Sequence, residues 1–327
     1  MVRRSPNSVP SGPNASIARS PPSEAPVSTP TSTSPPESAR GGPVTSTKRR
    51  RISPTPWLLL IPGAVLYLLV FVVPQAGLLA QSISPDGVAV TTEHYEAVLG
   101  DRFALGIIWR SIWIAALVAA ACAVLGFPLA YQLSRSTSRF KGLLVALTLF
   151  PLLTSAVIRT FGWQVIFYET GPISTFFSWF GADVTLIGSQ AGVIIALTQV
   201  LLPFMVLTLQ GVIRNIPVAL EEAAQDLGDG PIAVFTRVLL PLSKGGLLGG
   251  SLLVFSLAIS TYVTPALIGG ARVQVVATTI YQQAISLVNY PRAAAFAVVL
   301  LVITGIVVLV QTRLLSGESA AARGSER

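Results

Sequence analysis

The chain has 327 residues, of which 52% are hydrophobic and only 11% are charged, and its mean hydropathy is +0.68. A soluble globular protein carries about 25% charged residues, so most of this chain must face lipid. The single cysteine, Cys122, excludes an internal disulfide, and the single histidine, His94, excludes a histidine metal cluster. No phosphate-binding glycine loop occurs, so we expect no bound nucleotide and no cofactor. The net charge of +8 does not indicate nucleic-acid binding, because eight of the 22 basic residues lie in the first 51 positions.

Residues 1–51 are rich in Ser, Pro and Thr and show no hydrophobic periodicity. Such a segment cannot bury enough apolar surface to offset its ordering entropy, so we predict a disordered tail. The tail ends in four basic residues, Lys48 to Arg51. The apolar run that follows is longer than the roughly 7–15 residues of a signal-peptide core, so we expect a membrane span there rather than a cleaved signal.

Six uncharged intervals follow the tail. They lie at 52–85, 111–134, 142–158, 184–213, 245–271 and 293–312. Because a helix needs about 20 residues to cross a bilayer, we predict an all-α membrane protein with six transmembrane helices. Their expected positions are 57–80, 108–132, 142–166, 188–212, 246–268 and 292–312. The expected domains are the tail, a six-helix domain at 52–315 and a short polar tail at 316–327.

Basic residues are unevenly distributed around these spans. With the amino terminus inside, the inner loops hold Arg135, Arg139, Lys141, Arg214, Arg237 and Lys244. The outer loops hold only Arg102, Arg272 and Arg292. Because cytoplasmic loops are enriched in Lys and Arg, we predict that both termini are cytoplasmic.

Every Asp and Glu lies outside the six predicted spans. Proton- and sodium-coupled carriers usually place a carboxylate inside the bilayer, so a secondary carrier is disfavoured, although backbone carbonyls also coordinate sodium. No His or acid lies near Ser155 or Ser256 in the sequence, so we expect no enzyme activity. The run Gly245–Ser251 contains two overlapping small-xxx-small pairs. These pairs favour close helix packing, with a moving gate as the alternative, and composition alone also leaves a passive channel open.

The inner loop at 214–244 carries the most specific pattern in the chain. Asn215 is expected to cap a short helix, with Pro217 early in its first turn. Glu221 and Glu222 suit the positive end of the helix dipole. Gly228 is expected to end this helix in a left-handed conformation. A second short helix would then be capped by Asp229 and broken at Pro241. Two short surface helices with small residues and acids predict a docking site for a partner.

This loop resembles the EAA loop of binding-protein-dependent ABC importer permeases, whose pattern is E-A-A, three residues, G, nine residues and I-x-L-P. The matching residues are Glu222, Ala223, Ala224, Gly228, Val238, Leu240 and Pro241. Val238 replaces the usual Ile, and Asp229 stands where close relatives more often have Ala. The segments Phe150–Trp163, Leu201–Ile213 and Ser251–Gly270 are similar to the spermidine/putrescine branch of that family. Importers of iron, opines and aminophosphonates share much of this similarity and stay open as alternatives.

The resemblance implies a type I importer permease in a bacterial inner membrane, forming half of a translocation channel. The implied partners are a second, different permease, two ATPase subunits inside and an extracytoplasmic solute-binding protein. Hydrolysis of ATP would belong to the ATPase subunits. The residues assigned to ATPase coupling are Glu221, Glu222, Ala223, Ala224, Asp226, Gly228 and Pro241. A carrier or channel, or a scaffold without transport, is the alternative from a different class.

Arg159 is the ionisable residue of the third predicted span. An arginine that points into the path would hinder a polyamine, since two like charges about 4 Å apart repel by about 4 kcal/mol at an effective dielectric of about 20. We therefore interpret Arg159 as a structural charge near the outer membrane edge, facing backbone carbonyls or a carboxylate. Ser155, Trp163 and Tyr262 are predicted to line the translocation path, because hydroxyl and aromatic groups suit an alkylammonium solute.

Overall fold

The computed structural model of the protein describes residues 55–84, 92–179, 181 and 185–324. The tail predicted at 1–51 lies outside these residues. From Trp57 onward the chain forms one compact unit, and its described part is helical apart from short connections. This confirms the predicted all-α fold.

Four π-helical segments, labelled η, occur among the α-helices of the described residues. In chain order the elements are α1 (Thr55–Tyr67), η1 (Leu68–Val72), α2 (Val73–Ile83), α3 (Glu93–Leu99), α4 (Arg102–Arg135), α5 (Lys141–Leu153), α6 (Ala156–Phe167), α7 (Pro172–Ser178), α8 (Gln190–Arg214), α9 (Val218–Asp226), α10 (Pro231–Val234), η2 (Phe235–Leu239), α11 (Leu240–Ser260), η3 (Pro265–Gly269), α12 (Val276–Tyr281), η4 (Gln282–Ser286) and α13 (Tyr290–Gly324).

Five helical stretches of the described chain are long and apolar enough to cross a membrane. They are Ile61–Ile83, Arg102–Arg135, Gln190–Arg214, Pro231–Ser260 and Tyr290–Arg313. Each overlaps one of the predicted spans, but the boundaries differ. The second starts earlier than expected, because the Asp101 side chain caps α4 by accepting a hydrogen bond from the Phe103 N–H at 2.9 Å. The last continues in α13 to Gly324, beyond the expected end at 312.

The third predicted span, 142–166, is not one helix, and that prediction is wrong. It is divided into α5 and α6, which meet at a bend of 103°. At the break Thr154 is extended, and Ser155 has a non-helical ψ of 134°. The Thr154 hydroxyl donates to the Pro151 carbonyl at 3.1 Å, which in a continuous helix would accept from the N–H of residue 155. Counted as one broken span, the pair brings the total to six.

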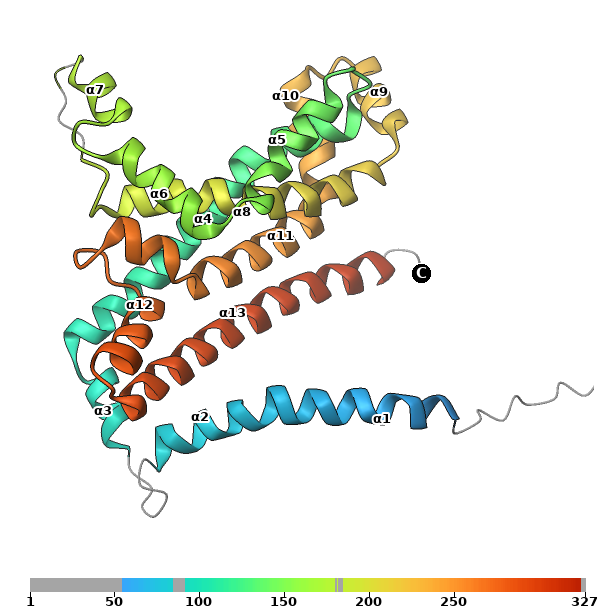
Figure 1. Cartoon of the computed structure of the whole chain (residues 1–327). Coiled ribbons are helices and arrows are strands. Elements are labelled where there is room, and N and C mark those ends of the chain that lie inside the picture. The colour runs from blue at the N-terminus through green and yellow to red at the C-terminus, as the bar shows by residue number, and fades with distance from the viewer. Residues whose placement is uncertain (1–54, 85–91, 180, 182–184, 325–327) are drawn as a thin grey trace, which may run out of the picture. The chain divides into compact units, whose positions relative to one another are not determined.

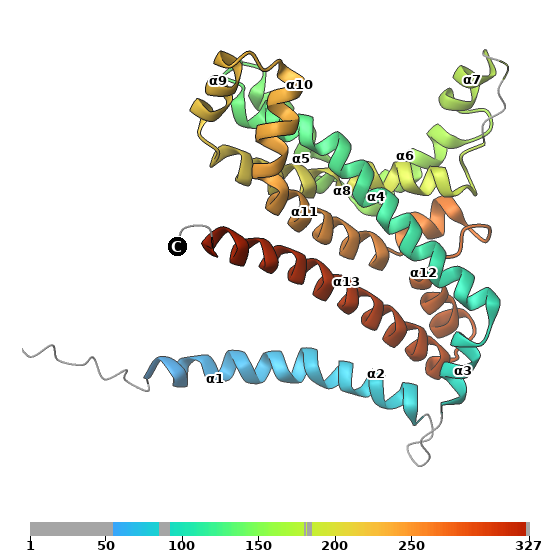
Figure 2. The ribbon, with the colours of Figure 1, turned by 180° about the vertical axis from the view of Figure 1, so that it is seen from behind.

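The centre of the molecule is formed by α4, α8 and α11, which pack against one another along their lengths (Figures 1 and 2). Val118, Val193, Met205 and Val254 from these three helices are fully buried. A second cluster joins α3, α12 and the start of α13 around Ile107. In both views α9 and α10 lie at one end of the long helices, whereas α3 and α12 lie at the other. The central helices therefore connect the two ends directly.

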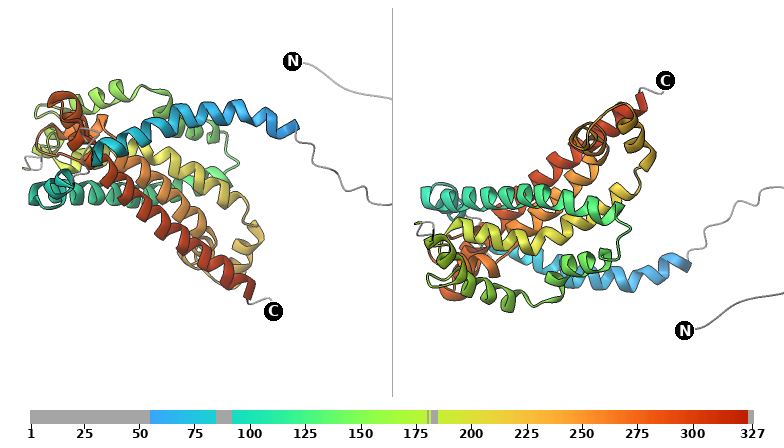
Figure 3. Two further views of the ribbon diagram at one scale, coloured as in Figure 1. Left: turned by 90° about the horizontal axis from the view of Figure 1, so that it is seen from below. Right: turned by 90° about the horizontal axis from the view of Figure 1, so that it is seen from above.

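The first span is the least covered part of the bundle. Its second half, α2, lies against α13, whereas α1 diverges from α13 (Figure 3). Large apolar side chains from Ile61 to Val73 are more than 40% exposed on every side of the helix. A helix that is apolar all round and uncovered by protein is suited to lipid or to another transmembrane chain.

The glycine run of α11 packs with only one of its two small-residue pairs. A Cβ added at Gly246 would lie 2.6 Å from Cγ2 of Val212, and one at Gly250 would lie 2.7 Å from Sδ of Met205. A Cβ at Gly245 or Gly249 would meet nothing within 4 Å. The pair Gly246 and Gly250 therefore lets α11 approach α8 closely, as the sequence predicts.

We expect Gly246→Ala to destabilise the bundle by about 1–3 kcal/mol, because the stiff Val212 side chain cannot yield without a shift of α8. Gly245→Ala, one residue away, is the matched control, with the same gain in helix propensity and free space for the methyl group. The measurement is the thermal midpoint of the detergent-solubilised protein for both variants. Equal midpoints would contradict the assigned packing.

Candidate functional site

The loop between the fourth and fifth spans forms two short helices, α9 and α10, at one end of the bundle (Figures 1 and 2). Pro217 occupies the N-cap position of α9 and supplies no side-chain cap. The prediction that Asn215 caps this helix is wrong. Its side chain instead donates to the Gly211 carbonyl at 3.0 Å, since Asn215 itself terminates α8.

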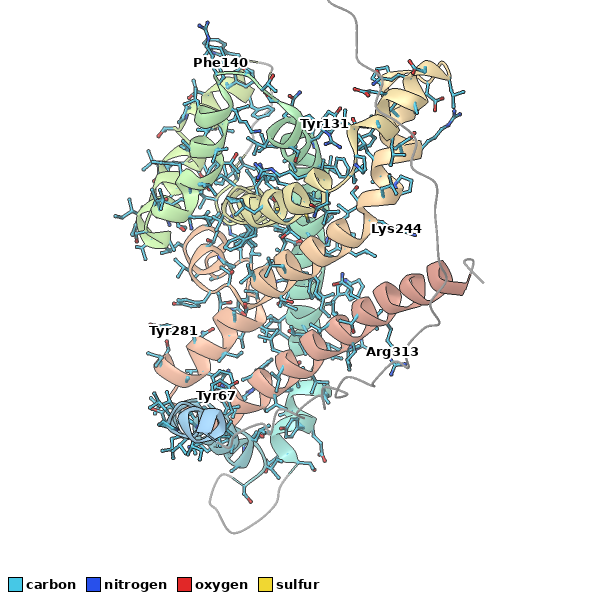
Figure 4. All side chains as sticks on the ribbon, turned by 90° about the vertical axis from the view of Figure 1, so that its right-hand side faces the viewer. Tyr67, Tyr131, Phe140, Lys244, Tyr281 and Arg313 are labelled. Carbon is cyan, nitrogen blue, oxygen red and sulfur yellow. The ribbon has the colours of Figure 1, made fainter. Side chains whose placement is uncertain are left out.

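Glu221 is buried at the inner face of α9, with only 5% of its side chain exposed. Its Oε1 accepts from Nε of Arg135 at 2.8 Å, and its Oε2 accepts from the Tyr131 hydroxyl at 3.0 Å. Both partners come from the last turns of α4, where residues four apart share one face. Figure 4 labels Tyr131 on this helix, on the side of the molecule where the loop helices lie. The carboxylate thereby ties α9 to α4.

The turn after α9 depends on Gly228, which has φ 92°. The Gly228 N–H donates to the Gln225 carbonyl at 2.9 Å, and the Asp229 N–H donates to the Ala224 carbonyl at 3.0 Å. These two bonds form a Schellman motif, which satisfies carbonyls at the helix end. The left-handed conformation predicted for Gly228 is present.

The outer face of α9 and the following turn carry acidic and apolar side chains together. Glu222, Ala223 and Asp226 are exposed, whereas Ala224 faces the bundle. Leu227 is 89% exposed and Ile232 is 79% exposed. We call Glu222, Asp226, Leu227 and Ile232 the loop surface. Leu227 lies on the turn after α9 and Ile232 lies in α10, so this loop exposes two large apolar side chains.

The second loop helix does not end at Pro241, so the predicted break is wrong. Instead, α10, η2 and α11 run on as one apolar stretch from Pro231 to Ser260. The π-helical turn Phe235–Leu239 comes directly before Pro241 and provides a wider turn around its ring. Asp229 is also not the cap of α10, because Gly230 is in that position. Asp229 pairs with Arg237 at 2.7 Å instead.

Two of the three residues predicted to line a path contact other side chains. Trp163 donates from Nε1 to Oε1 of Gln199 at 3.4 Å and is partly buried. Tyr262 stacks on Tyr281 with ring centroids 4.4 Å apart. Ser155 is exposed at the start of α6 and makes no side-chain cap.

Arg159 lies in the first turns of α6, beside the break and not near the far end of a span. Its Nη1 donates to the Pro151 carbonyl, on the other side of the bend. The side chain therefore bridges α5 and α6. Its Nε is buried and has no hydrogen-bond partner among the described residues.

The family model for the binding-protein-dependent transport system inner membrane component matches residues 122–316. This range runs from the second half of α4 into α13 and includes the loop surface. The match covers more than half of the chain. The chain belongs to this family. It is a membrane-spanning transport permease and not an enzyme.

Similar proteins include permeases with different solutes. The spermidine/putrescine transport system permease protein PotB of Escherichia coli K12 is 30% identical over 226 residues, covering 68% of this chain and 82% of PotB. The molybdenum transport system permease protein ModB of Mycobacterium bovis is 32% identical over 200 residues, covering 61% of this chain and 75% of ModB. A permease chain in the crystal structure of a bacterial alginate ABC transporter with its alginate-bound periplasmic protein has a TM-score of 0.69 at 17% identity. It covers 80% of this chain and 93% of that one. This likeness confirms the importer permease fold.

Three side chains of this permease site were not predicted from the sequence. Tyr131 and Arg135 are four residues apart at the end of α4, so helical spacing could have indicated a shared face. What the sequence could not indicate is that this face meets Glu221 from 86 residues away. Gln199, the partner of Trp163, carries no local signal, because it lies among apolar residues of the fourth span.

Proposed function

We propose that this permease forms half of the translocation channel of an ATP-driven importer for polyamines such as spermidine and putrescine. A second, different permease would form the other half. Two ATPase subunits would dock on one side of the membrane, and a solute-binding protein would dock on the other. Both termini, including the segment 1–51, would be cytoplasmic.

The loop surface is the proposed docking site for an ATPase subunit. Leu227 is exposed on a turn that a Schellman motif holds in shape, and Ile232 is exposed on α10. The acids of this surface are exposed on α9. Burial of one such leucine side chain in a partner contributes about 1.5–3 kcal/mol. We assign coupling to Glu222, Ala223, Asp226 and Gly228 directly, and to Glu221 and Ala224 through the placement of α9. Pro241 is assigned to coupling through the start of α11.

The proposed orientation follows from the ends of the helices. The end of α4 and the loop surface lie together through the contact between Arg135 and Glu221, and six basic residues belong to this side in the sequence. The opposite ends carry only three. Because Lys and Arg accumulate in cytoplasmic loops, we place the loop surface in the cytoplasm.

The observation that carries the solute proposal is the similarity to PotB over 82% of its length. Two features support a cationic solute on the outer side. The outer segments of the sequence hold six acids against three basic residues. The stacked Tyr262 and Tyr281 rings offer aromatic faces, and a cation–π contact contributes about 0.5–2 kcal/mol. We propose Trp163, Tyr262 and Ser155 as path residues on the same chemical grounds, and Arg159 as a structural charge.

The test is uptake by cells that lack this chain. We expect loss of high-affinity uptake of labelled spermidine and putrescine, with recovery when the chain is restored together with its ATPase and binding protein. Uptake of labelled molybdate, iron and an aminophosphonate is measured in the same cells. Unchanged polyamine uptake would reject the polyamine assignment, and loss of molybdate, iron or aminophosphonate uptake would identify the solute instead.

A further inference from the structure

Arg135 contacts two separate points of the loop from the last residue of α4. Its Nε and Nη2 lie 2.8 and 2.6 Å from Oε1 of Glu221. Nη2 also donates to the Ile216 carbonyl at 2.8 Å. Ile216 lies between α8 and α9, and Glu221 lies in the first turn of α9. One guanidinium group therefore contacts both the backbone just before α9 and a side chain on the inner face of α9.

The pair of charges is largely withdrawn from water, with 17% of the Arg135 side chain and 5% of the Glu221 side chain exposed. Burial of two charges is unfavourable unless hydrogen bonds satisfy them. Here both carboxylate oxygens have a donor, because the Tyr131 hydroxyl serves Oε2. An apolar contact would attach α9 as firmly. What the planar guanidinium adds is a fixed direction between the two helices.

The position of these residues connects the loop surface with the spans. Glu221 is buried against the bundle, whereas the adjacent Glu222 is exposed. The two neighbouring acids therefore lie on opposite faces of α9. On the other side of the contact, α4 runs for 34 residues and packs against both α8 and α11. A displacement of α9 that is passed to Arg135 would therefore reach the centre of the bundle.

We propose that Tyr131, Arg135 and Glu221 form a clamp that transmits movement of α9 to α4, so that these residues position the spans and do not themselves bind the ATPase. This inference rests on the proposed function. It separates two tasks within one short helix. The loop surface would determine whether the ATPase is held, and the clamp would determine whether its hydrolysis is converted into transport.

The test uses the complete importer in proteoliposomes, with both permeases, the ATPase subunits and the binding protein. Two quantities are measured: the ATPase retained per permease after purification, and the solute taken up per ATP hydrolysed. We expect Glu221→Gln and Arg135→Lys to retain the ATPase within twofold of the wild type and to lower uptake per ATP at least fivefold. The double variant should be no worse than the poorer single variant, because both break one contact.

Glu222→Gln is the matched control, since it makes the same chemical change at the next residue, on the exposed side. Because Glu222 belongs to the loop surface, we expect this variant to lower ATPase retention, which the clamp variants leave within twofold of the wild type. Should Arg135→Lys or Glu221→Gln fail to insert, Tyr131→Phe removes one donor and leaves the ion pair, with an expected twofold or greater loss of uptake per ATP.

Normal uptake per ATP in the clamp variants would overturn the inference. So would a loss of ATPase retention in Glu221→Gln as large as in a loop-surface variant, because Glu221 would then act in docking. Failure of the proposed function has a different signature. In that case the wild-type chain retains no ATPase, or variants of Leu227 retain as much as the wild type.

Discussion

Leu227→Asp is expected to lower retention of the ATPase subunits at least tenfold. Leu227 is 89% exposed, on the ordered turn that follows α9. Loss of its burial in a partner would remove about 1.5–3 kcal/mol, and about 1.4 kcal/mol corresponds to a tenfold change in affinity. A carboxylate at the centre of an apolar contact adds a desolvation penalty. The measurement is the amount of ATPase that co-purifies with the permease in detergent.

Ile232→Asp tests the second apolar side chain of the loop surface and should act in the same direction. Gln225→Asp is the control, since it adds the same charge to an exposed position of α9 and removes no apolar contact. Retention within twofold of the wild type for both Leu227→Asp and Ile232→Asp would contradict the docking assignment.

The spans could be predicted from the sequence because a lipid bilayer restricts the backbone to a few structures. Every backbone polar group within a bilayer must be bonded internally, so a long uncharged stretch becomes a helix. Five spans were therefore located from charge alone. The break at Thr154 and Ser155 was missed, since Thr and Ser are compatible with a helix. At the break, the Thr154 hydroxyl and the Arg159 guanidinium both donate to the Pro151 carbonyl, and no local sequence pattern indicates these contacts.

In the loop, too, features with a local cause were predictable, whereas features that depend on distant residues were not. The conformation of Gly228 follows from its own lack of a Cβ and was predictable. The continuous helix through Pro241 was not, because the π-helical turn before it has no reliable sequence signal. The burial of Glu221 was not predictable either. Both Glu221 and Glu222 are acids at the start of the predicted helix, and only the position of Arg135 on α4 shows which of them is buried.

Gly228→Val is expected to lower transport at least fivefold and also to reduce thermal stability. At φ 92° a non-glycine residue is strained by about 1–2 kcal/mol, and a β-branched side chain is among the least tolerated. The chain then either keeps the strain or abandons the turn. If the turn is lost, the two Schellman hydrogen bonds are lost with it, and Leu227 no longer has a fixed direction.

Gly230→Val is a close control for this substitution. A Cβ at either glycine would meet nothing within 4 Å, so neither variant creates a clash. The two positions differ in backbone conformation, because Gly230 has φ −72° and ψ 169°, which valine adopts without strain. We expect Gly230→Val to transport solute within twofold of the wild type and to match its thermal midpoint. Equal effects of the two variants on uptake would show that bulk on this surface matters and that the left-handed turn does not.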